Sequence, residues 1–129
     1  MASEIQLSVV MQVTKGLLQY SQVPGTGLFD MTGTKSAGGA QTAATGNGIA
    51  IDIGTLSATT LGYAYFRNTS STAGEVILIG TGTTSFVPFL ELQPREFAVF
   101  RFNSTGSGVT PTFKSSAGTP TLQYWIAEK

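Results

Sequence analysis

Short runs of β-branched, aliphatic and aromatic residues recur along the whole chain, and each run is bounded by Gly, Pro, Asn or Ser. This pattern is the signature of β-strands, and we find no convincing helical segment. The candidate strands are, in chain order, Ile5–Val13, Gly16–Tyr20, Ile49–Ile53, Gly62–Arg67, Glu75–Gly80, Phe86–Leu92, Phe97–Phe102 and Leu122–Ala127, with weaker ones at Gly27–Met31 and Thr110–Lys114. Eight to ten short strands in 129 residues predict an all-β sandwich or barrel.

One segment has no large apolar residue. Residues 32–48, TGTKSAGGAQTAATGNG, are rich in Gly, Thr and Ala, so they lack the side chains that anchor a segment in a core. We therefore expect a single domain over residues 1–129 in which 32–48 is either an exposed flexible loop or an arm that orders against a neighbour.

The most apolar stretch, FVPFLELQPREFAVFRF at residues 86–102, reads as two strands joined at Gln93–Glu96. As a hairpin with a two- or four-residue loop, it pairs Leu90 with Val99 and Phe89 with Phe100, and both faces are apolar. A sandwich core covers one face only. The other face is covered either by the chain's own loops or by a second subunit, and the low charge content favours the subunit.

Several kinds of chemistry lack their usual residues. The chain has no Cys and no His, which removes disulfides, thiolate metal sites and the commonest general base. Its carboxylates are scattered outside any metal-binding motif, and a hydrolase that uses paired carboxylates, with Asp30 and Asp52 as candidates, is the alternative from the enzyme class. The segment GTGTTS after EVILIG leads into another strand rather than a helix, so we interpret it as a turn and not as a phosphate loop. We expect no enzyme activity and no cofactor.

Charge and hydropathy argue against two classes of partner. Seven basic and seven acidic residues cancel, so the surface offers no electrostatic footprint for nucleic acid or an anionic membrane. No stretch approaches the ~20 apolar residues of a membrane-spanning helix, and MASEIQLSVVMQV lacks a signal-peptide pattern. We expect a protein made in a cytoplasm. The aromatic residues Tyr63, Tyr65, Tyr124 and Trp125 leave a sugar-stacking platform open as an alternative to packing.

Taken in order, GYAYFRNTSS, EVILIG, FVPFLELQPREFAVFRF and LQYWIAEK resemble small all-β virion proteins of tailed bacteriophages. In that group an aromatic strand ending in Arg-Asn leads to a V-x-I-G strand and then to L-x-P-x-E-F-A. The resemblance covers most of the chain except residues 32–48. One departure is Arg95, where these proteins commonly have Gly; Pro94-Arg95 is typical of a type I turn with both φ values negative.

The resemblance implies an antiparallel β-sandwich of jelly-roll type and a structural role in the particle. The expected function is that of a capsid decoration (cement) protein on the virion surface, often trimeric, which bridges subunits of the major capsid protein. The alternative is a tail- or fibre-associated module that binds a receptor glycan. The predicted interface residues are Val87, Phe89, Phe100 and Phe102 on the second hairpin face, with Lys35, Gln41 and Asn47 from residues 32–48.

Overall fold

The computed structural model describes residues 4–103 and 108–129, which form twelve strands and no helix. The chain is therefore an all-β protein, as the strand pattern predicts. The chain divides into two compact units, Met1–Thr32 and Gly33–Lys129.

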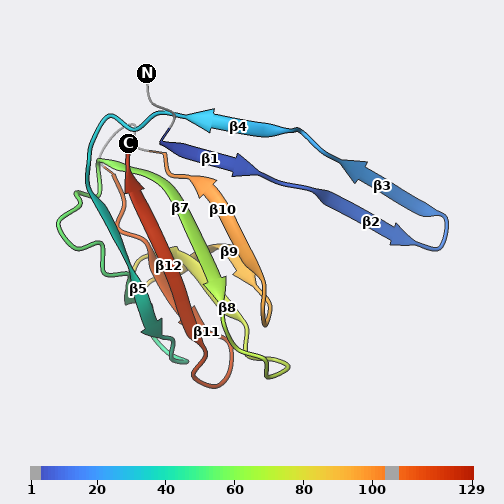
Figure 1. Cartoon of the computed structure of the whole chain (residues 1–129). Helices are drawn as coiled ribbons and strands as arrows, with labels where there is room; N and C mark the ends of the chain where they lie inside the picture. The colour runs from blue at the N-terminus through green and yellow to red at the C-terminus, as the bar shows by residue number, and fades with distance from the viewer. Residues whose placement is uncertain (1–3, 104–107) are drawn as a thin grey trace. The chain divides into compact units, whose positions relative to one another are not determined.

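The first unit is one long antiparallel ribbon. β1 (Ile5–Ser8) pairs with β4 (Thr26–Phe29), and β2 (Met11–Lys15) pairs with β3 (Leu18–Gln22). Figure 1 shows β2 and β3 continuing the ribbon that β1 and β4 begin. Two residues, Gly16 and Leu17, close it, and the φ of +58° at Gly16 with a negative φ at Leu17 is the geometry of a type II′ hairpin turn. We call residues 5–29 the hairpin arm.

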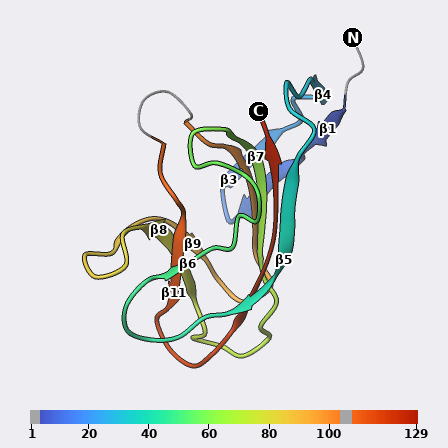
Figure 2. The same cartoon turned by 90° about the vertical axis from the view of Figure 1, so that its left-hand side faces the viewer.

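The second unit is an eight-stranded jelly roll. Its strands are β5 (Ser36–Thr42), β6 (Ile49–Ala50), β7 (Leu61–Asn68), β8 (Ile77–Thr81), β9 (Val87–Leu92), β10 (Phe97–Arg101), β11 (Thr112–Ser115) and β12 (Thr121–Glu128). They pair in nested fashion, β8 with β9, β7 with β10, β6 with β11 and β5 with β12. This nested ribbon is wound into two sheets, of order β10-β7-β12-β5 and β6-β11-β8-β9, through the further pairs β12–β7 and β11–β8. Figure 2 shows the two sheets as separate layers.

Alternate residues of each strand fill the space between the layers, as the two-residue period of a strand requires. Ala64 and Phe66 point inward from β7, and Ile77 and Ile79 point inward from β8. The remaining buried apolar side chains of the core are Ala37, Ala43, Ile51, Leu56, Leu61, Leu92, Phe113, Leu122, Tyr124 and Ile126.

Residues 86–102 do not form the expected hairpin. β9 pairs with β8 and β10 pairs with β7, so the two strands belong to different sheets and the predicted register is wrong. The rings of Phe89 and Phe100 still meet edge to face, with their centroids 6.1 Å apart, but they do so between the layers and not along a ladder. The apolar residues on both faces therefore belong to a corner that crosses the sandwich.

The corner itself is a tight turn over Gln93–Glu96. The Glu96 amide donates to the Gln93 carbonyl at 3.0 Å, and Arg95 has a φ of +70°. Proline followed by a residue with positive φ is the type II turn, so the expected type I turn is also corrected.

A strand forms where a flexible loop was one of the two expectations. Residues 36–42 are β5, which pairs along its whole length with β12, from Ser36 opposite Ala127 to Thr42 opposite Thr121. Ala37 and Ala43 enter the core, so small side chains suffice to anchor this strand.

Asn68 ties the end of β7 to both sheets. It is fully buried, and its Nδ2 donates to the carbonyls of Glu75 and Leu92 at 2.8 and 3.1 Å. Its Oδ1 accepts from the Ser70 amide at 3.0 Å. Because every polar atom of this amide has a partner, burial costs it little.

Candidate interaction surfaces

The hairpin arm carries a high density of exposed apolar side chains. Leu17, in the turn, has an exposed fraction of 104%, and Val10 and Val23 exceed 60%. The other large apolar residues of the arm that are at least half exposed are Val9, Met11, Leu18, Tyr20 and Leu28. A two-stranded ribbon has no second layer to cover its faces, and such a hairpin is at best marginally stable alone in water. This set of residues is therefore a candidate interaction surface.

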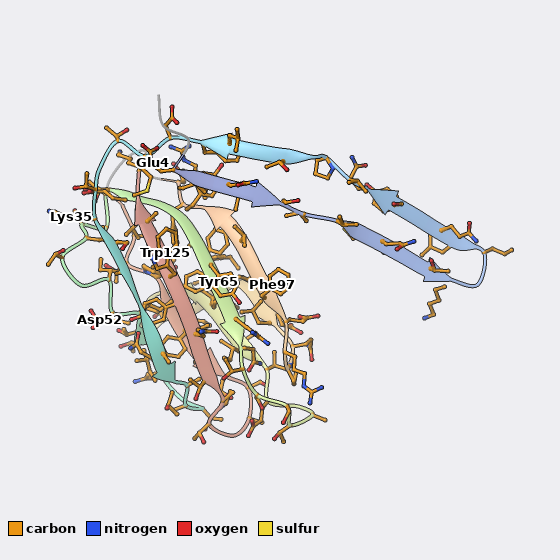
Figure 3. All side chains as sticks on the ribbon, viewed as in Figure 1. Glu4, Lys35, Asp52, Tyr65, Phe97 and Trp125 are labelled. Atoms are coloured by element: carbon orange, nitrogen blue, oxygen red, sulfur yellow. The ribbon has the colours of Figure 1, made fainter. Side chains whose placement is uncertain are left out.

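A second surface lies on the outer side of the sheet β10-β7-β12-β5. Tyr63, Tyr65 and Arg67 alternate with the core residues of β7, and their neighbours on the same face come from β10 and β12. Figure 3 shows Trp125, Tyr65 and Phe97 on three adjacent strands. We call this surface the aromatic face; its members are Tyr63, Tyr65, Arg67, Phe97, Val99, Arg101, Gln123 and Trp125.

The register arranges the aromatic face in rows. One row runs Gly38, Trp125, Tyr65 and Val99 across four strands. Trp125 leans over Gly38, because a Cβ built on that glycine would lie 3.0 Å from the indole Cδ1. The indole therefore lies low against the sheet with 41% of its surface exposed.

Cation–π and ring contacts hold the rest of the face. The Arg101 guanidinium lies 5.5 Å from the centre of the Tyr63 ring. The Tyr65 and Phe97 rings stack with centroids 6.2 Å apart, although Phe97 remains 65% exposed. The members of the aromatic face are Tyr, Trp, Phe, Arg, Val and Gln, a mix rich in the types that dominate binding surfaces.

A third feature is an apolar pocket of about 270 Å³ between the two layers, beside the open edges of β9 and β10. Its lining is Thr81, Phe89, Phe100, Arg101, Phe102, Asn103, Val109 and Pro111. The Phe100 and Phe102 rings pack at 5.0 Å and both lie against the core, which fixes one wall. Phe89 and Val109 are more than half exposed at the same pocket.

The four predicted interface residues of 86–102 divide between these settings. Val87 and Phe89 are exposed on β9, whereas Phe100 and Phe102 are half-buried against the core. A one-residue irregularity in the β8–β9 ladder, between Ile79 and Gly80, leaves Phe89 without a ladder partner. Three of the four therefore meet at the apolar pocket rather than on one sheet face.

The three predicted residues of 32–48 have different surroundings. Gln41 is engaged within its own unit: its Nε2 donates to the Ala50 carbonyl at 3.2 Å, and its Oε1 accepts from the Asp52 amide at 2.8 Å. The Lys35 amide donates to a carboxylate oxygen of Glu128 at 3.2 Å, and its side chain is exposed. Asn47 is exposed between β5 and β6.

Asp52, one of the two candidate carboxylates, supports a turn, as Glu96 also does. Asp52 Oδ1 accepts from the Gly54 amide at 2.9 Å, and Glu96 Oε2 accepts from the Gln93 amide at 2.8 Å. Asp30 and Asp52 belong to different units. Within residues 4–103 and 108–129, no three His, Cys, Asp or Glu side chains gather as a metal site would require.

Tyr124 departs from the sugar-platform hypothesis. Its ring is buried in the core, and its hydroxyl donates to the Asp52 carbonyl at 2.9 Å. Burial raises the pKa of this hydroxyl, and the nearby Asp52 carboxylate raises that pKa further. The other three candidates, Tyr63, Tyr65 and Trp125, do share the aromatic face.

Two sets of surface residues escaped the sequence analysis. Phe97 was not predicted as a surface residue, because the expected pairing of residues 97–102 with 86–92 is wrong and β10 lies beside β7 instead. The apolar residues of the arm were assigned to strands, and the signal that marks their exposure is the polar alternation MQVTK and LQYSQ on both sides of Gly16.

Comparisons with protein-family models, with curated proteins and with solved structures find no match to this chain. In the part of the chain that the structure describes, no helix is long and apolar enough to cross a membrane.

Proposed function

We propose that the protein is a structural protein of a bacteriophage virion, a decoration protein that binds the assembled capsid and bridges subunits of the major capsid protein. The observation that carries this proposal is the hairpin arm with its exposed apolar residues. Each of these residues is at least half exposed, and all of them lie on one two-stranded ribbon. A standard-size interface takes about 800 Å² from each partner, which a surface of several such side chains can contribute.

The proposed mechanism is burial without a chemical step. Apolar surface removed from water stabilises a contact by about 25 cal/mol per Å², of which association consumes a large part. A modest contact repeated over a shell therefore strengthens the whole particle. In this proposal the protein is a homo-oligomer, a trimer, on the capsid surface, and it needs no cofactor, nucleic acid or membrane.

Particles that carry the protein provide the test. Quantitative mass spectrometry of purified particles should give a copy number that matches the capsid lattice. A handful of copies per particle would place the protein at a tail or vertex and contradict decoration.

A matched pair of arm variants tests the mechanism. Met11→Asp and Thr14→Asp each add one carboxylate to β2, but only the first removes an exposed apolar side chain. Rebinding to stripped particles should fall at least tenfold for Met11→Asp and stay within about twofold for Thr14→Asp, since tenfold in affinity corresponds to about 1.4 kcal/mol. Equal binding by both variants would remove the arm from the mechanism.

A second candidate function is favoured by the aromatic face. Trp125 and Tyr65 lie in one row and Gln123 and Arg67 in the next, so flat rings and planar polar groups alternate as a pyranose ring with its hydroxyls would require. A glycan array distinguishes the candidates: saturable binding that Trp125→Ala abolishes, and that Phe89→Ala on the other sheet leaves intact, supports a receptor-binding module.

A further inference from the structure

We propose that the hairpin arm of one copy inserts its tip, Leu17, into the apolar pocket of a second copy. This contact rests on the proposed function and specifies how copies join within it. It also gives the predicted interface residues Phe89, Phe100 and Phe102 a defined role, as walls of the receiving pocket.

The tip is built to protrude. Leu17 stands in the turn, where Gly16 takes the positive φ, and its side chain is fully exposed beside Leu18, which is 59% exposed. A leucine in a two-residue turn contributes nothing to the ladder of its own hairpin, so burial against another surface is its main source of stabilisation.

The pocket suits such a side chain. Its walls come from Phe89, Phe100, Phe102, Val109 and Pro111, and its volume of about 270 Å³ accommodates a branched aliphatic group. Arg101 also lines it, but the guanidinium of Arg101 is held over the Tyr63 ring on the aromatic face. An aliphatic knob can therefore enter without displacing a charge from water.

The length of the arm favours a pocket that belongs to a second copy of the chain. The stretch from Leu17 to Phe29 spans about 40 Å at ~3.3 Å per residue. The arm joins the jelly roll at Gly33, whose amide donates to the Lys129 carbonyl at 2.8 Å at the end of β12.

The pocket lies close to that junction. Phe102 donates its amide to the Gly62 carbonyl at 3.0 Å, and Lys129 donates to the Thr60 carbonyl at 2.9 Å, so both ends meet the beginning of β7. From β5 to β10 the sheet has three strand spacings, about 15 Å. An extended arm of about 40 Å is longer than this span of about 15 Å, so its tip is suited to reach the pocket of a second copy.

A knob and a pocket at different places on one chain make a head-to-tail contact. Such a contact closes into a ring when the rotation between copies allows it. The expected product is a closed oligomer, with three copies as in the proposed function.

Cysteine cross-linking tests the contact directly, because the chain has no native cysteine. Leu17→Cys and Val109→Cys are made in separate full-length chains, mixed after denaturation and refolding, and treated with a short bismaleimide. A covalent heterodimer on a denaturing gel is the expected result. Thr14→Cys with Val109→Cys is the matched control, since Thr14 lies on the same arm away from the tip, and it should give little product.

The other outcomes overturn the contact. If the chain carrying both Leu17→Cys and Val109→Cys cross-links only within itself, the arm folds back and the second copy is wrong. If no product forms while light scattering still shows an oligomer, copies join elsewhere. Leu17→Asp should convert the oligomer to monomer with strand content unchanged by circular dichroism, and an unchanged oligomer would also overturn it.

Failure here and failure of the proposed function give different results. Cross-linked oligomers that never bind stripped particles keep the arm-to-pocket contact and remove the capsid role. Chains that decorate particles without the Leu17–Val109 cross-link keep the capsid role and remove the contact.

Discussion

Arg95 holds a backbone conformation that residues other than Gly, Asn and Asp rarely adopt. Its φ of +70° completes the type II turn at the corner, and its amide donates to the Asn68 carbonyl at 3.0 Å. A side chain in the left-handed region costs roughly 1–2 kcal/mol, whereas glycine pays only a backbone entropy cost of about 0.5–1 kcal/mol.

Arg95→Gly should therefore raise the free energy of unfolding by about 0.5–1 kcal/mol. Urea denaturation followed by tryptophan fluorescence measures the change. Arg67→Gly, in which the same residue type is removed from a regular strand position, should instead destabilise, because glycine weakens a strand interior.

Asn68 is the buried residue whose loss should cost most for its size. Asn68→Ala removes the partner of the Leu92 carbonyl, which is buried, and of the Glu75 carbonyl and Ser70 amide, which are partly buried, and each buried group left unsatisfied costs about 1–3 kcal/mol. We expect a loss of about 3–5 kcal/mol in the free energy of unfolding. Thr69→Ala next to it, which removes one exposed hydroxyl bond to Thr121, should lose less than about 1.5 kcal/mol.

Tyr124 makes the fold sensitive to alkali. Its pKa is raised in the folded state, so between the ordinary value of about 10 and the raised one the folded protein binds more protons than the unfolded protein. The stability is complete below pH 10 and falls as the pH rises through the raised pKa.

Tyr124→Phe should lower the free energy of unfolding by about 1 kcal/mol at pH 7, because the hydrogen bond from the hydroxyl to the Asp52 carbonyl is lost. It should also flatten the decline above pH 10. Denaturation midpoints at pH 7, 10 and 11 give both readings, and a decline as steep as in the parent protein would assign the alkaline sensitivity to other groups.

At the scale of elements, the irregularity between β8 and β9 depends on Gly80. A Cβ on this residue would lie 2.1 Å from the Val87 carbonyl oxygen and 2.7 Å from Pro88 Cα, both backbone atoms that cannot swing away. Glycine at such a bulge lets two backbones approach closely.

Gly80→Ala should destabilise by about 2–4 kcal/mol, as expected for backbone displacement in a packed sheet. Gly39→Ala is the control, because its Cβ would meet only the Tyr124 ring at ordinary contact distances from 3.5 Å. Thermal unfolding of both variants compares them, and equal melting temperatures would mean that the ladder adjusts around Gly80.

The elements that were predicted from the sequence are those in which the pattern of apolar side chains indicates burial. β8 and β12 carry large apolar residues at their inward positions and β7 is rich in aromatic residues, and the existence and type of these strands were predicted. β5 was missed because Ser, Ala and Gly residues do not indicate from the sequence whether a segment is buried. The evidence that this segment is a strand is its ladder with β12 and the close approach of Trp125 to Gly38, and both depend on β12.

The candidate surfaces were harder to predict because they depend on partners far apart in the sequence. The apolar pocket joins β9 to β10 and to Val109 and Pro111, and adjacency along the chain suggested a hairpin instead. The aromatic face required knowing that Phe97 and Arg101 lie beside β7. Which strands lie beside each other, and in which sheet, is decided by the tertiary structure. The residue pattern within a single strand does not predict it.

At the scale of the whole molecule, the nested pairing has consequences for the order in which contacts form. Five residues separate β8 from β9, whereas residues 43–120 separate β5 from β12. Closing a loop costs entropy that grows with its length, and topologies dominated by distant pairs fold in about milliseconds to seconds.

The same substitution, Ile to Val, at two fully buried positions in different strands tests the order in which the strand pairs form. Ile79→Val lies in β8 and Ile126→Val lies in β12, and each should cost about 0.5–1.5 kcal/mol at equilibrium. Stopped-flow refolding should slow for Ile79→Val, whereas Ile126→Val should mainly speed unfolding. The reverse assignment would place the nucleus at the ends of the ribbon.

If pairing proceeds outward from β8–β9, the last pair to form is β5 with β12, and Gly33, where the arm joins the jelly roll, bonds to Lys129 just beyond that ladder. The nested pairing of the jelly roll would then set the order in which its parts form. The pocket, whose walls lie on the inner strand pairs, would then form before the base of the same chain's arm is fixed. In the proposed contact, a chain that is still folding would then be able to bind the arm tip of another copy in its pocket before its own arm is fixed. Assembly would proceed by the addition of the arms of fully folded subunits to chains that have not finished folding.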